Sequence, residues 1–535
     1  MKIPLSLRLF ALSIIMLGIQ NIGFAQSKEM KVSPLRFAGV HALSSVQGES
    51  EAFLVIHSAS GGNWNFELLD AEMNDIQSGT IEAPTHSFFN SICFNEGFTM
   101  MSFVVNAFTP SITYVVLDLT GHEVARTTRF DVPNLRRGDQ FFPSIYQHPE
   151  HGFVIVQSTG KGRSTGYTVE QVDYHLNTIW SMEFGGQGAQ VHVYDLIGLE
   201  NRLYILEATE RLGKTLSARL HGIDLQENVH IYTMELSDDK HSYFPTAMLP
   251  RDDNSIALAG TYFKGDKIRG KNTRGLFFLD VDEAGHTAGM GLHPWSGLRS
   301  TLRTPVSDWF FKVMPDVYIH ALEFNEDKSY TAITELYRYS GEISRENNWG
   351  KQEKYHRIRM LDFMLVNFDH QGIINYTERI ERPHMVLKLD SELGGGSSSL
   401  AEKAGSGPLK RAMAMKKAGA FTYRFHLKSE ENFHLAFVGY ENKRHNVYLM
   451  DLYNEYTAIK IDLVHAKPVA ISYLQIIDLC VNQSGFGFIL SELNTRSFDD
   501  SEAYWRGILP GRNGSMLTYE YMPLNGRLKL NLLLK

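Results

Sequence analysis

The sequence predicts an all-β protein, an eight-bladed β-propeller built from four-stranded antiparallel blades. Three observations predict this fold class. A short apolar run rich in β-branched and aromatic residues recurs along the chain. Each run is followed by a polar connection and then by a further apolar run that ends at an Asp or Asn. The spacing between successive Asp or Asn residues of this kind is close to the length of one propeller blade. Such a sheet leaves two apolar faces in water unless copies of it stack against one another.

Eight of the recurring runs are expected to form the second strands of the blades. They lie at residues 52–57, 97–102, 152–157, 202–207, 255–260, 330–335, 433–438 and 485–490. The third strands of blades one to seven end near Asp or Asn at positions 70, 118, 173, 224, 280, 367 and 451, whereas the eighth, at residues 504–509, lacks this residue. Seven blades are the alternative, because a terminal blade can be shared between both chain ends.

Residues 1–25 have the three parts of a secretory signal peptide. Lys2 and Arg8 make its start positive, residues 9–18 are apolar, and small residues precede the expected cleavage site before Gln26. A membrane anchor is the alternative, but a spanning helix needs about 20 apolar residues. The sequence therefore predicts export to the periplasm or beyond, with no membrane span and with residues 26–535 forming a single propeller domain.

Two insertions are expected, at about residues 289–316 and 391–420. In the first, Thr304 before Pro305 favours a helix start, which predicts a helix packed on the propeller or a lid over a ligand. The second contains a glycine- and serine-rich stretch that predicts a mobile loop. A short basic helix is expected over residues 408–417.

The composition excludes several classes of protein. With 43% hydrophobic, 12% aromatic and 21% charged residues, the chain has enough apolar surface for a large core and is not disordered. Its two cysteines, Cys93 and Cys480, exclude a disulfide scaffold. Both lie in predicted first strands with blade one between them, so two buried thiols are expected instead of a disulfide. A formal net charge of −8 excludes a globally basic nucleic-acid-binding protein.

The blades resemble those of secreted bacterial β-propellers built from loosely related repeats. The resemblance covers nearly all of residues 34–535, and neither the Trp-Asp and Gly-His marks of WD repeats nor the double glycines of kelch repeats are present. Proteins of this kind are mostly of unassigned function. The resemblance therefore implies a fold and no particular activity.

The sequence has no catalytic, metal or cofactor motif. The segment from Gly265 to Asn272 is one residue short of a phosphate-binding loop and lacks its hydroxyl residue. Residues 280–285 resemble the start of a calcium loop, but Gly291 stands where the bidentate Glu belongs. A turn with Gly285 at positive φ explains that segment better. No His-Glu-x-x-His or Gly-x-Ser-x-Gly sequence occurs, so no cofactor and no metal are expected.

One set of loops is basic. In blades three to seven the connections between second and third strands each carry more Lys and Arg than Asp and Glu, at residues 158–168, 207–219, 264–274, 338–359 and 441–445. The predicted anion-binding residues in them are Lys161, Arg163, Arg211, Lys214, Lys264, Lys267, Arg269, Lys271, Arg274, Lys443 and Arg444, joined by Arg136, Arg137 and Lys240 from connections between blades.

In a propeller these two kinds of connection share one face, which predicts a crescent of positive potential there. The turns between first and second strands, on the other face, are acidic. Backbone preferences of tight turns explain Asp and Asn in the acidic turns equally well, and the solubility of Lys-rich loops is the alternative for the crescent.

These observations favour an exported, non-catalytic propeller that binds an anionic partner such as an acidic glycan, a lipid head group or an acidic protein. The alternative is an enzyme acting on extracellular polysaccharide, a lyase or glycoside hydrolase with its site at the channel mouth. His192, His241 and Tyr243 are compatible with that role. A third hypothesis is a structural scaffold that uses the acidic turns or the loop at 394–420.

Overall fold

The computed structural model describes the chain between residues 23 and 534, with gaps. The described residues are 23–33, 37–44, 50–59, 62–105, 110–130, 144–148, 151–161, 164–185, 190–199, 201–211, 214–265, 268, 273–303, 315–346, 352–382, 385–390, 412, 415–416, 421–428, 433–441, 444–452, 458–462, 467–471, 486–488, 505–522 and 525–534. They are almost entirely β-strand, with two short 3-10 turns, η3 (Leu298–Thr301) and η4 (Arg512–Gly514). None of their helical segments has the length and apolarity of a membrane span.

Blade five shows how the repeated sequence forms a sheet. Its strands β18 (His241–Pro250), β19 (Ile256–Lys264), β20 (Thr273–Val281) and β21 (Thr287–Pro294) pair antiparallel in chain order. Every residue of β19 except the last is buried, because strand side chains alternate between two faces and both faces are covered. Ile256 and Leu258 pack toward blade four, whereas Ala257 and Ala259 pack toward blade six.

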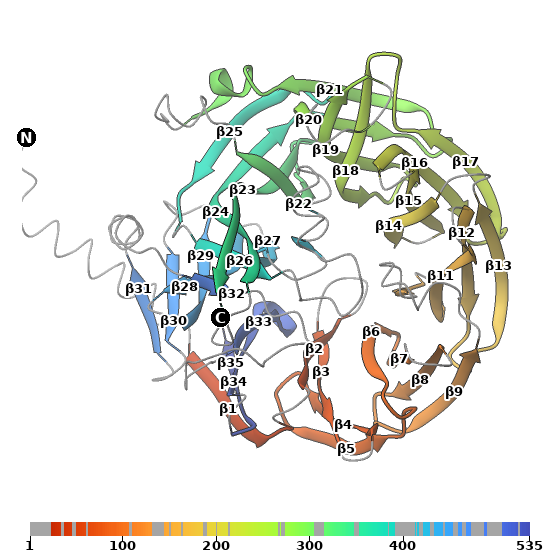
Figure 1. The fold of residues 1–535 in the computed structure, drawn as a ribbon, viewed down its shortest axis with the longest axis vertical. Helices are drawn as coiled ribbons and strands as arrows, with labels where there is room; N and C mark the ends of the chain where they lie inside the picture. Colours follow the sequence, from red (N-terminus) through yellow and green to blue (C-terminus); the bar gives the residue numbers. More distant parts are fainter. Residues whose placement is uncertain are drawn as a thin grey trace, which may run out of the picture. The chain divides into compact units, whose positions relative to one another are not determined.

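Eight such blades make the fold an eight-bladed β-propeller (Figure 1). Blade one is β2 (Phe37–Ser44), β3 (Ser50–Ser58), β4 (Trp64–Asp70) and β5 (Asp75–Ile81), and blade two is β6 (Phe88–Asn95), β7 (Phe98–Val105), β8 (Ser111–Asp118) and β9 (Glu123–Phe130). Blade three is β10 (Ser144–Gln147), β11 (Phe153–Lys161), β12 (Ser164–Val172) and β13 (Thr178–Gly185). Blade four is β14 (Gln190–Leu199), β15 (Arg202–Arg211), β16 (Lys214–Asp224) and β17 (Val229–Glu235).

The remaining complete blades follow the same order. Blade six is β22 (Asp316–Phe324), β23 (Tyr330–Glu346), β24 (Gln352–Phe368) and β25 (Ile374–Ile380), and blade seven is β27 (Tyr423–Lys428), β28 (Phe433–Glu441), β29 (Arg444–Asp451) and β30 (Ala458–Asp462), extended by β31 (Lys467–Ile471). The predicted fold class is confirmed, and the predicted second strands of blades one to seven coincide with β3, β7, β11, β15, β19, β23 and β28.

The eighth blade differs from the prediction. Residues 504–509 were expected to be its third strand, but β33 (Trp505–Pro510) is its first. Its other strands are β34 (Met516–Met522), β35 (Arg527–Leu534) and, from the opposite end of the chain, β1 (Gly23–Lys31). The run at 485–490 is not its second strand, because β32 (Phe486–Phe488) pairs in parallel with β26 (Met385–Asp390). Blade sharing between the two ends thus occurs within eight blades, not seven.

The chain divides into two compact units. One contains blades one, seven and eight, from residues 1–82, 422–485 and 495–535. Its core includes Phe53 of blade one and Leu517 of blade eight. The other contains blades two to six, from residues 83–421 and 486–494, and it carries the pocket described below.

The Asp residues that mark the repeat close the turns between third and fourth strands. The carboxylates of Asp70, Asp118 and Asp173 each accept the backbone N–H groups of the residues two and four positions later. In blades five and six, Asp282 and Asp369 have this role, not the expected residues at 280 and 367. The rejected calcium loop is therefore a turn, and its Gly285 has φ of 86°, as predicted.

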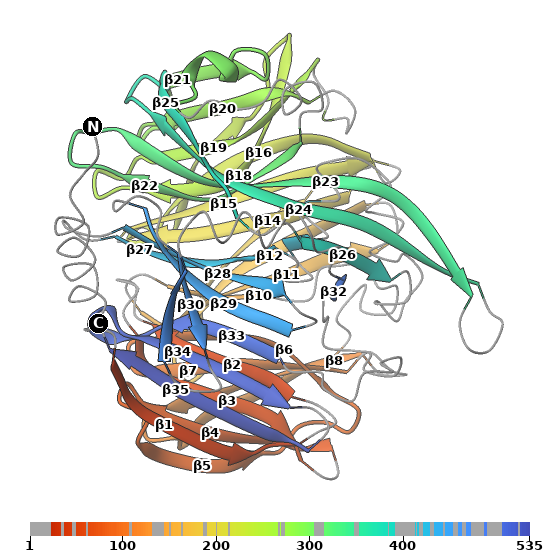
Figure 2. The same cartoon turned by 90° about the vertical axis from the view of Figure 1, so that its left-hand side faces the viewer.

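Several predicted loops between second and third strands are largely strand. Strands β11 and β12 pair out to Lys161 and Ser164, and β15 and β16 pair out to Arg211 and Lys214. Strands β23 and β24 continue as a long hairpin that extends well beyond the rest of blade six (Figure 2). Residues 158–168, 207–219 and 338–359 are therefore mainly hairpin ends, because their backbone groups remain paired across the two strands.

The two insertions are described in part. Strand β21 continues to Pro294, so the connection to blade six begins after that residue and not at 289, and the predicted helix at 304–314 lies outside the described residues. In the second insertion, residues 391–411 also lie outside them. Met415 and Lys416 are helical, Met415 is fully buried, and Lys416 Nζ lies 3.2 Å from Asp195 Oδ2 of β14.

Cys93 lies in β6, the first strand of blade two, as predicted. It is a free cysteine, and burial raises the pKa of its thiol to about 12. Cys480 lies outside the described residues.

Candidate functional site

An open pocket of about 890 Å³ lies at one edge of blade five. Its lining comes from the turn before β18, the end of β19, the start of β20 and the residues after β21. In an antiparallel blade the first and third strands start at the edge where the second and fourth end. The register brings His241 opposite Lys264, and Gly275 opposite both Tyr262 and Pro294. The blade topology therefore assembles this site from segments distant in sequence.

Three cationic side chains line the pocket: Lys240, Lys264 and Arg274. All three are exposed, and none forms an ion pair with any residue that the structure describes. Asp239 is the one carboxylate in the lining. The lining therefore carries a net positive charge, which attracts anions to this concave surface.

Asp238 shapes the turn that presents Lys240 and His241. Its carboxylate accepts the backbone N–H groups of both residues at 2.7 Å and also accepts the hydroxyl of Tyr243. Desolvation raises the pKa of Asp238, but these hydrogen bonds outweigh it and hold the pKa below its usual value. The carboxylate is thus ionised and occupied by the turn at neutral pH.

The ring of Tyr262 belongs to the lining and lies over Gly275, which leaves room for it. A Cβ atom at Gly275 would lie 2.7 Å from Tyr262 Cε1 and would also collide with the carbonyl oxygen of His293. The ring of His241 meets the ring of Tyr262 edge to face, with centroids 5.3 Å apart. Burial raises the pKa of Tyr262, and the positive charge of Arg274 lowers it in part.

Trp295 adds a second aromatic side chain to the lining. Its backbone N–H donates a 3.0 Å hydrogen bond to the carbonyl oxygen of Arg274, which ties the chain after β21 to the start of β20. The indole is half-buried and packs in part against the core between blades five and six. Both the backbone and the side chain of Trp295 are thereby fixed in this wall of the pocket.

Two polar atoms of the lining residues are buried without a hydrogen-bond partner among the described residues. They are Thr273 Oγ1 and His241 Nδ1. Buried polar atoms in proteins are paired in the great majority of cases. His241 Nδ1 lies 3.6 Å from Asp238 Oδ1, within ion-pair distance of the carboxylate that shapes the turn. Both atoms are buried, so neither is exposed to a ligand in the pocket.

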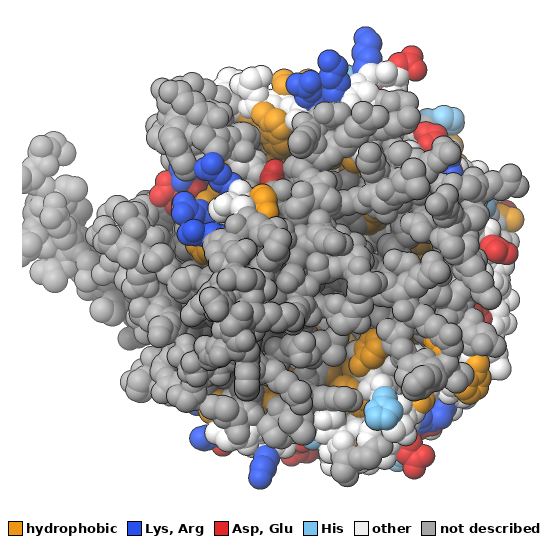
Figure 3. All heavy atoms as spheres, in the orientation of Figure 1, with side chains coloured by type: hydrophobic (Ala, Val, Ile, Leu, Met, Phe, Trp, Pro, Cys, Tyr) orange, Lys and Arg blue, Asp and Glu red, His pale blue; other side chains and the backbone are white. Residues whose placement is uncertain are grey.

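The structure brings three of the fourteen predicted anion-binding residues together, namely Lys240, Lys264 and Arg274. The backbones of Lys161, Arg211, Lys214 and Arg444 lie in β11, β15, β16 and β29, and their side chains are outside the described part of the structure. Arg136, Arg137, Arg163, Lys267, Arg269, Lys271 and Lys443 lie outside the described residues altogether. In Figure 3, the Lys and Arg side chains that are visible form small groups with Asp and Glu nearby, not one continuous patch.

Sequence reasoning missed Tyr262, Thr273 and Trp295. Trp295 was assigned to an insertion, because the end of β21 was expected earlier in the chain. Tyr262 lies two residues after the predicted strand at 255–260, and Thr273 lies within the predicted connection at 264–274. Neither position by itself marks a pocket-lining residue. The usable signal was that strand ends of blade five on the basic side carry two aromatic residues.

Two of the catalytic candidates named for the alternative hypothesis, His241 and Tyr243, lie beside the same carboxylate, Asp238. His241 lines the pocket, and Tyr243 is buried and donates to Asp238. The side chain of His192 lies outside the described part. Among the described residues, no group of three or more His, Cys, Asp or Glu side chains is arranged to hold a metal ion.

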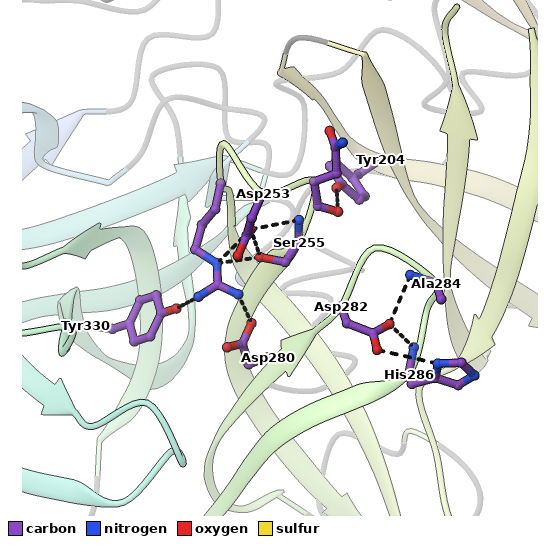
Figure 4. A network of polar contacts seen from close by, with 10 residues as sticks. Tyr204, Asp253, Ser255, Asp280, Asp282, Ala284, His286 and Tyr330 are labelled. Atoms are coloured by element: carbon purple, nitrogen blue, oxygen red, sulfur yellow. Dashed lines mark hydrogen bonds and ion pairs between the residues drawn. The ribbon is translucent and has the colours of Figure 1, made fainter. Parts of the chain in front are cut away.

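A second polar network occupies the opposite edge of blade five (Figure 4). Arg251 donates to Ser255 Oγ at 2.5 Å and to Asp280 Oδ1 at 2.9 Å, and Asp253 accepts the backbone N–H of Ser255. Asp327 accepts the corresponding N–H group of Ser329 in blade six. Asp253 and Asp327 thus form hydrogen bonds within their own first-to-second turns, as the alternative explanation of the acidic turns predicts.

Two acidic side chains in the core belong to closed networks. Glu335 accepts Arg382 Nη2 at 2.6 Å and lies 3.0 Å from His320 Nε2, and Glu335 and Arg382 are almost fully buried. Glu207 accepts the hydroxyl of Tyr167 at 3.0 Å and lies 3.0 Å from His221 Nε2. Their burial makes these groups elements of blade packing. The blade-five pocket, in contrast, is open and lined by exposed cations.

The fold and this pocket define a β-propeller protein with a cationic, partly aromatic site on one blade. The chain belongs to DUF6770, a family of unknown function, whose family model matches residues 125–462. That segment includes every residue of the pocket lining. No curated protein matches the chain.

Solved structures with a likeness to this chain are distant. The Dos1 propeller has 8% identity and a TM-score of 0.40, over 96% of this chain and 95% of that chain. A europium-containing methanol dehydrogenase has 8% identity and a TM-score of 0.40, over 94% of each. A protein of unknown function from Bacteroides caccae has 10% identity and a TM-score of 0.27, over 62% of this chain and 99% of that chain. Likenesses this distant assign no activity.

Proposed function

We propose that this protein is an exported, non-catalytic binding propeller and that its blade-five pocket takes an anionic partner. The partner classes that suit the pocket are acidic glycans, lipid head groups and acidic proteins. The observation that carries the proposal is that Lys240, Lys264 and Arg274 converge on one pocket without an ion-pair partner among the described residues.

The three positive charges are suited to binding because no ion pair with a described residue has to be broken before they bind an anion. Exposed cations keep their hydration until a ligand arrives, and a concave surface focuses their potential. Arg can clamp a carboxylate or sulfate with two parallel hydrogen bonds, whereas Lys acts as a point charge. We expect affinity to fall steeply between about 0.1 M and about 1 M salt, since the screening length shrinks from about 10 Å to about 3 Å.

A charge reversal tests the proposal. The variant Lys240→Glu/Lys264→Glu/Arg274→Glu is compared with Lys31→Glu/Lys328→Glu/Arg512→Glu, which makes the same change in net charge at three exposed positions outside the pocket. The probes are inorganic polyphosphate and polygalacturonate, measured by calorimetry. We expect loss of binding in the pocket variant only, with melting temperatures of both variants close to that of the parent protein.

Two results would contradict the proposal. Equal binding by the two variants would show that net charge, not the pocket, determines association. Release of unsaturated, ultraviolet-absorbing sugars from polygalacturonate would show that the protein is a lyase, in which case the non-catalytic assignment is wrong.

A further inference from the structure

The volume of the blade-five pocket limits the classes of ligand that it can bind. Its volume of about 890 Å³ lies within the range of about 300–1,000 Å³ that is usual for small-molecule sites. Protein partners with acidic surfaces are usually met by broad interfaces of about 800 Å² on each side. A short, flexible ligand or the end of a polymer therefore fits this site better than a folded protein does.

Aromatic side chains in the lining narrow the class of ligand further. Trp295 and Tyr262 come from the end of the fourth strand and the end of the second, at the edge where Arg274 begins the third. The faces of aromatic rings carry partial negative charge, and the C–H groups on one face of a pyranose ring are apolar with partial positive charge. A sugar ring therefore matches an indole face, whereas a phosphate group alone does not.

We infer that the pocket binds an acidic oligosaccharide, with a sugar ring against Trp295 and the carboxylate or sulfate group held by Arg274 and the two lysines. This inference rests on the proposed function, because it names the ligand of the same site. Arg274 lies between the two aromatic residues, because its strand pairs with that of Tyr262 and its carbonyl oxygen accepts the backbone N–H of Trp295 at 3.0 Å. An acidic group on a ring stacked at Trp295 can therefore meet the guanidinium group.

The test compares ligands that differ in one property. Trigalacturonate is titrated beside its carboxyl-reduced neutral form, a sulfated trisaccharide and inorganic polyphosphate of similar charge. We expect trigalacturonate or the sulfated trisaccharide to bind at least about tenfold more tightly than the neutral form and than polyphosphate. The two acidic sugars distinguish carboxylate from sulfate as the recognised group.

Variants of the aromatic wall separate stacking from charge. Trp295→Leu keeps an apolar side chain against the core but removes the ring, and Trp295→Phe retains a smaller ring. We expect Trp295→Leu to weaken binding of the acidic sugar by about tenfold and polyphosphate not at all, with Trp295→Phe in between. Circular dichroism and melting temperature establish that each variant is folded.

Two outcomes would overturn the inference while leaving the proposed function intact. One is polyphosphate binding that is lost on charge reversal, with no preference for acidic sugar and no effect of Trp295→Leu. The other is preferential binding of anionic lipid vesicles or of a nucleotide. Absence of binding to every anionic probe would instead overturn the proposed function itself.

Discussion

The guanidinium group of Arg251 in blade five donates a 2.6 Å hydrogen bond to the hydroxyl of Tyr330 in blade six. In Figure 4, the side chains of Asp253, Ser255, Asp280 and Tyr330 converge on this one cation. Tyr204 of blade four reaches the same turn, where its hydroxyl donates to the carbonyl oxygen of Asn254 at 2.6 Å. One turn therefore links three successive blades by directional bonds in addition to their apolar packing.

Replacing Arg251 by Met should destabilise the unit of blades two to six by about 2 kcal/mol. Asp280 is buried, and its pKa is raised by desolvation and lowered in part by Arg251, so the variant leaves a buried carboxylate without its cation. Urea unfolding measures the change. Arg126→Met, which removes an exposed ion pair with Glu123, is the control and should cost less than about 1 kcal/mol. Equal losses would show that the turn network has no special role.

Gly275→Ala should disturb the pocket directly. The added Cβ would meet the ring of Tyr262 and the carbonyl oxygen of His293, so one of them must move. We expect a destabilisation of about 1–3 kcal/mol together with weaker anion binding. Gly185→Ala is the matched control, since no atom lies within 4 Å of its added Cβ. Unchanged stability and binding in Gly275→Ala would mean that Tyr262 is not positioned as described.

His148 should make the fold sensitive to acid. It is 1% exposed, its Nδ1 accepts the backbone N–H of His151, and desolvation followed by the charge of His151 lowers its pKa to about 4. Because the pKa in the unfolded chain is about 6.5, folding favours the neutral ring. This stability is complete above about pH 6.5 and is lost as the pH falls through about 4, to a total of about 3 kcal/mol.

The variant His148→Asn isolates this effect. Its stability difference from the parent protein, measured by urea unfolding, should narrow as the pH falls from 7 toward 4. His370→Asn, at an exposed position, should show no such trend. A difference that stays constant with pH would exclude His148 as the titrating group.

The shared eighth blade provides a test of both ends of the chain. Strand β1 pairs with β35 from Gly23 to Lys31, with Gln26 opposite Leu532. The predicted signal cleavage before Gln26 leaves residues 26–31 to form this strand. A chain that begins at Gln26 should fold normally, whereas one that begins at Val32 should lose more than about 3 kcal/mol, because β35 loses its paired neighbour. Mass spectrometry of exported protein gives the true start, and equal stability of the two chains would show that β1 is dispensable.

Much of the fold could be predicted because each blade repeats one local pattern. The runs that became β3, β7 and β19 are rich in apolar residues, and these strands are buried at nearly every position, which is typical of strands with both faces covered. The turn aspartates could be predicted as a repeat because their role is local, between a carboxylate and backbone groups two to four residues away. In blades five and six the prediction named positions 280 and 367, but the turns are closed two residues later, by Asp282 and Asp369.

The eighth blade could not be predicted in this way. Its strand β34 begins after the turn η4 and lacks the preceding pattern, and its fourth strand comes from residues 23–31. Pairing across more than 490 residues leaves no local mark, since β1 and β35 recognise each other through backbone hydrogen bonds that any extended segment can form.

By itself the sequence determined the fold class, the order of the strands in seven blades and the side of blade five on which its cationic residues lie, because these depend on short-range alternation and on chain direction. Only the tertiary structure decided that Lys240, Lys264, Arg274, Tyr262 and Trp295 share one pocket. The physical reason is that the register between strands brings these residues together and that Gly275 leaves room for the ring of Tyr262. The spacing of residues along the chain specifies neither the register nor this room.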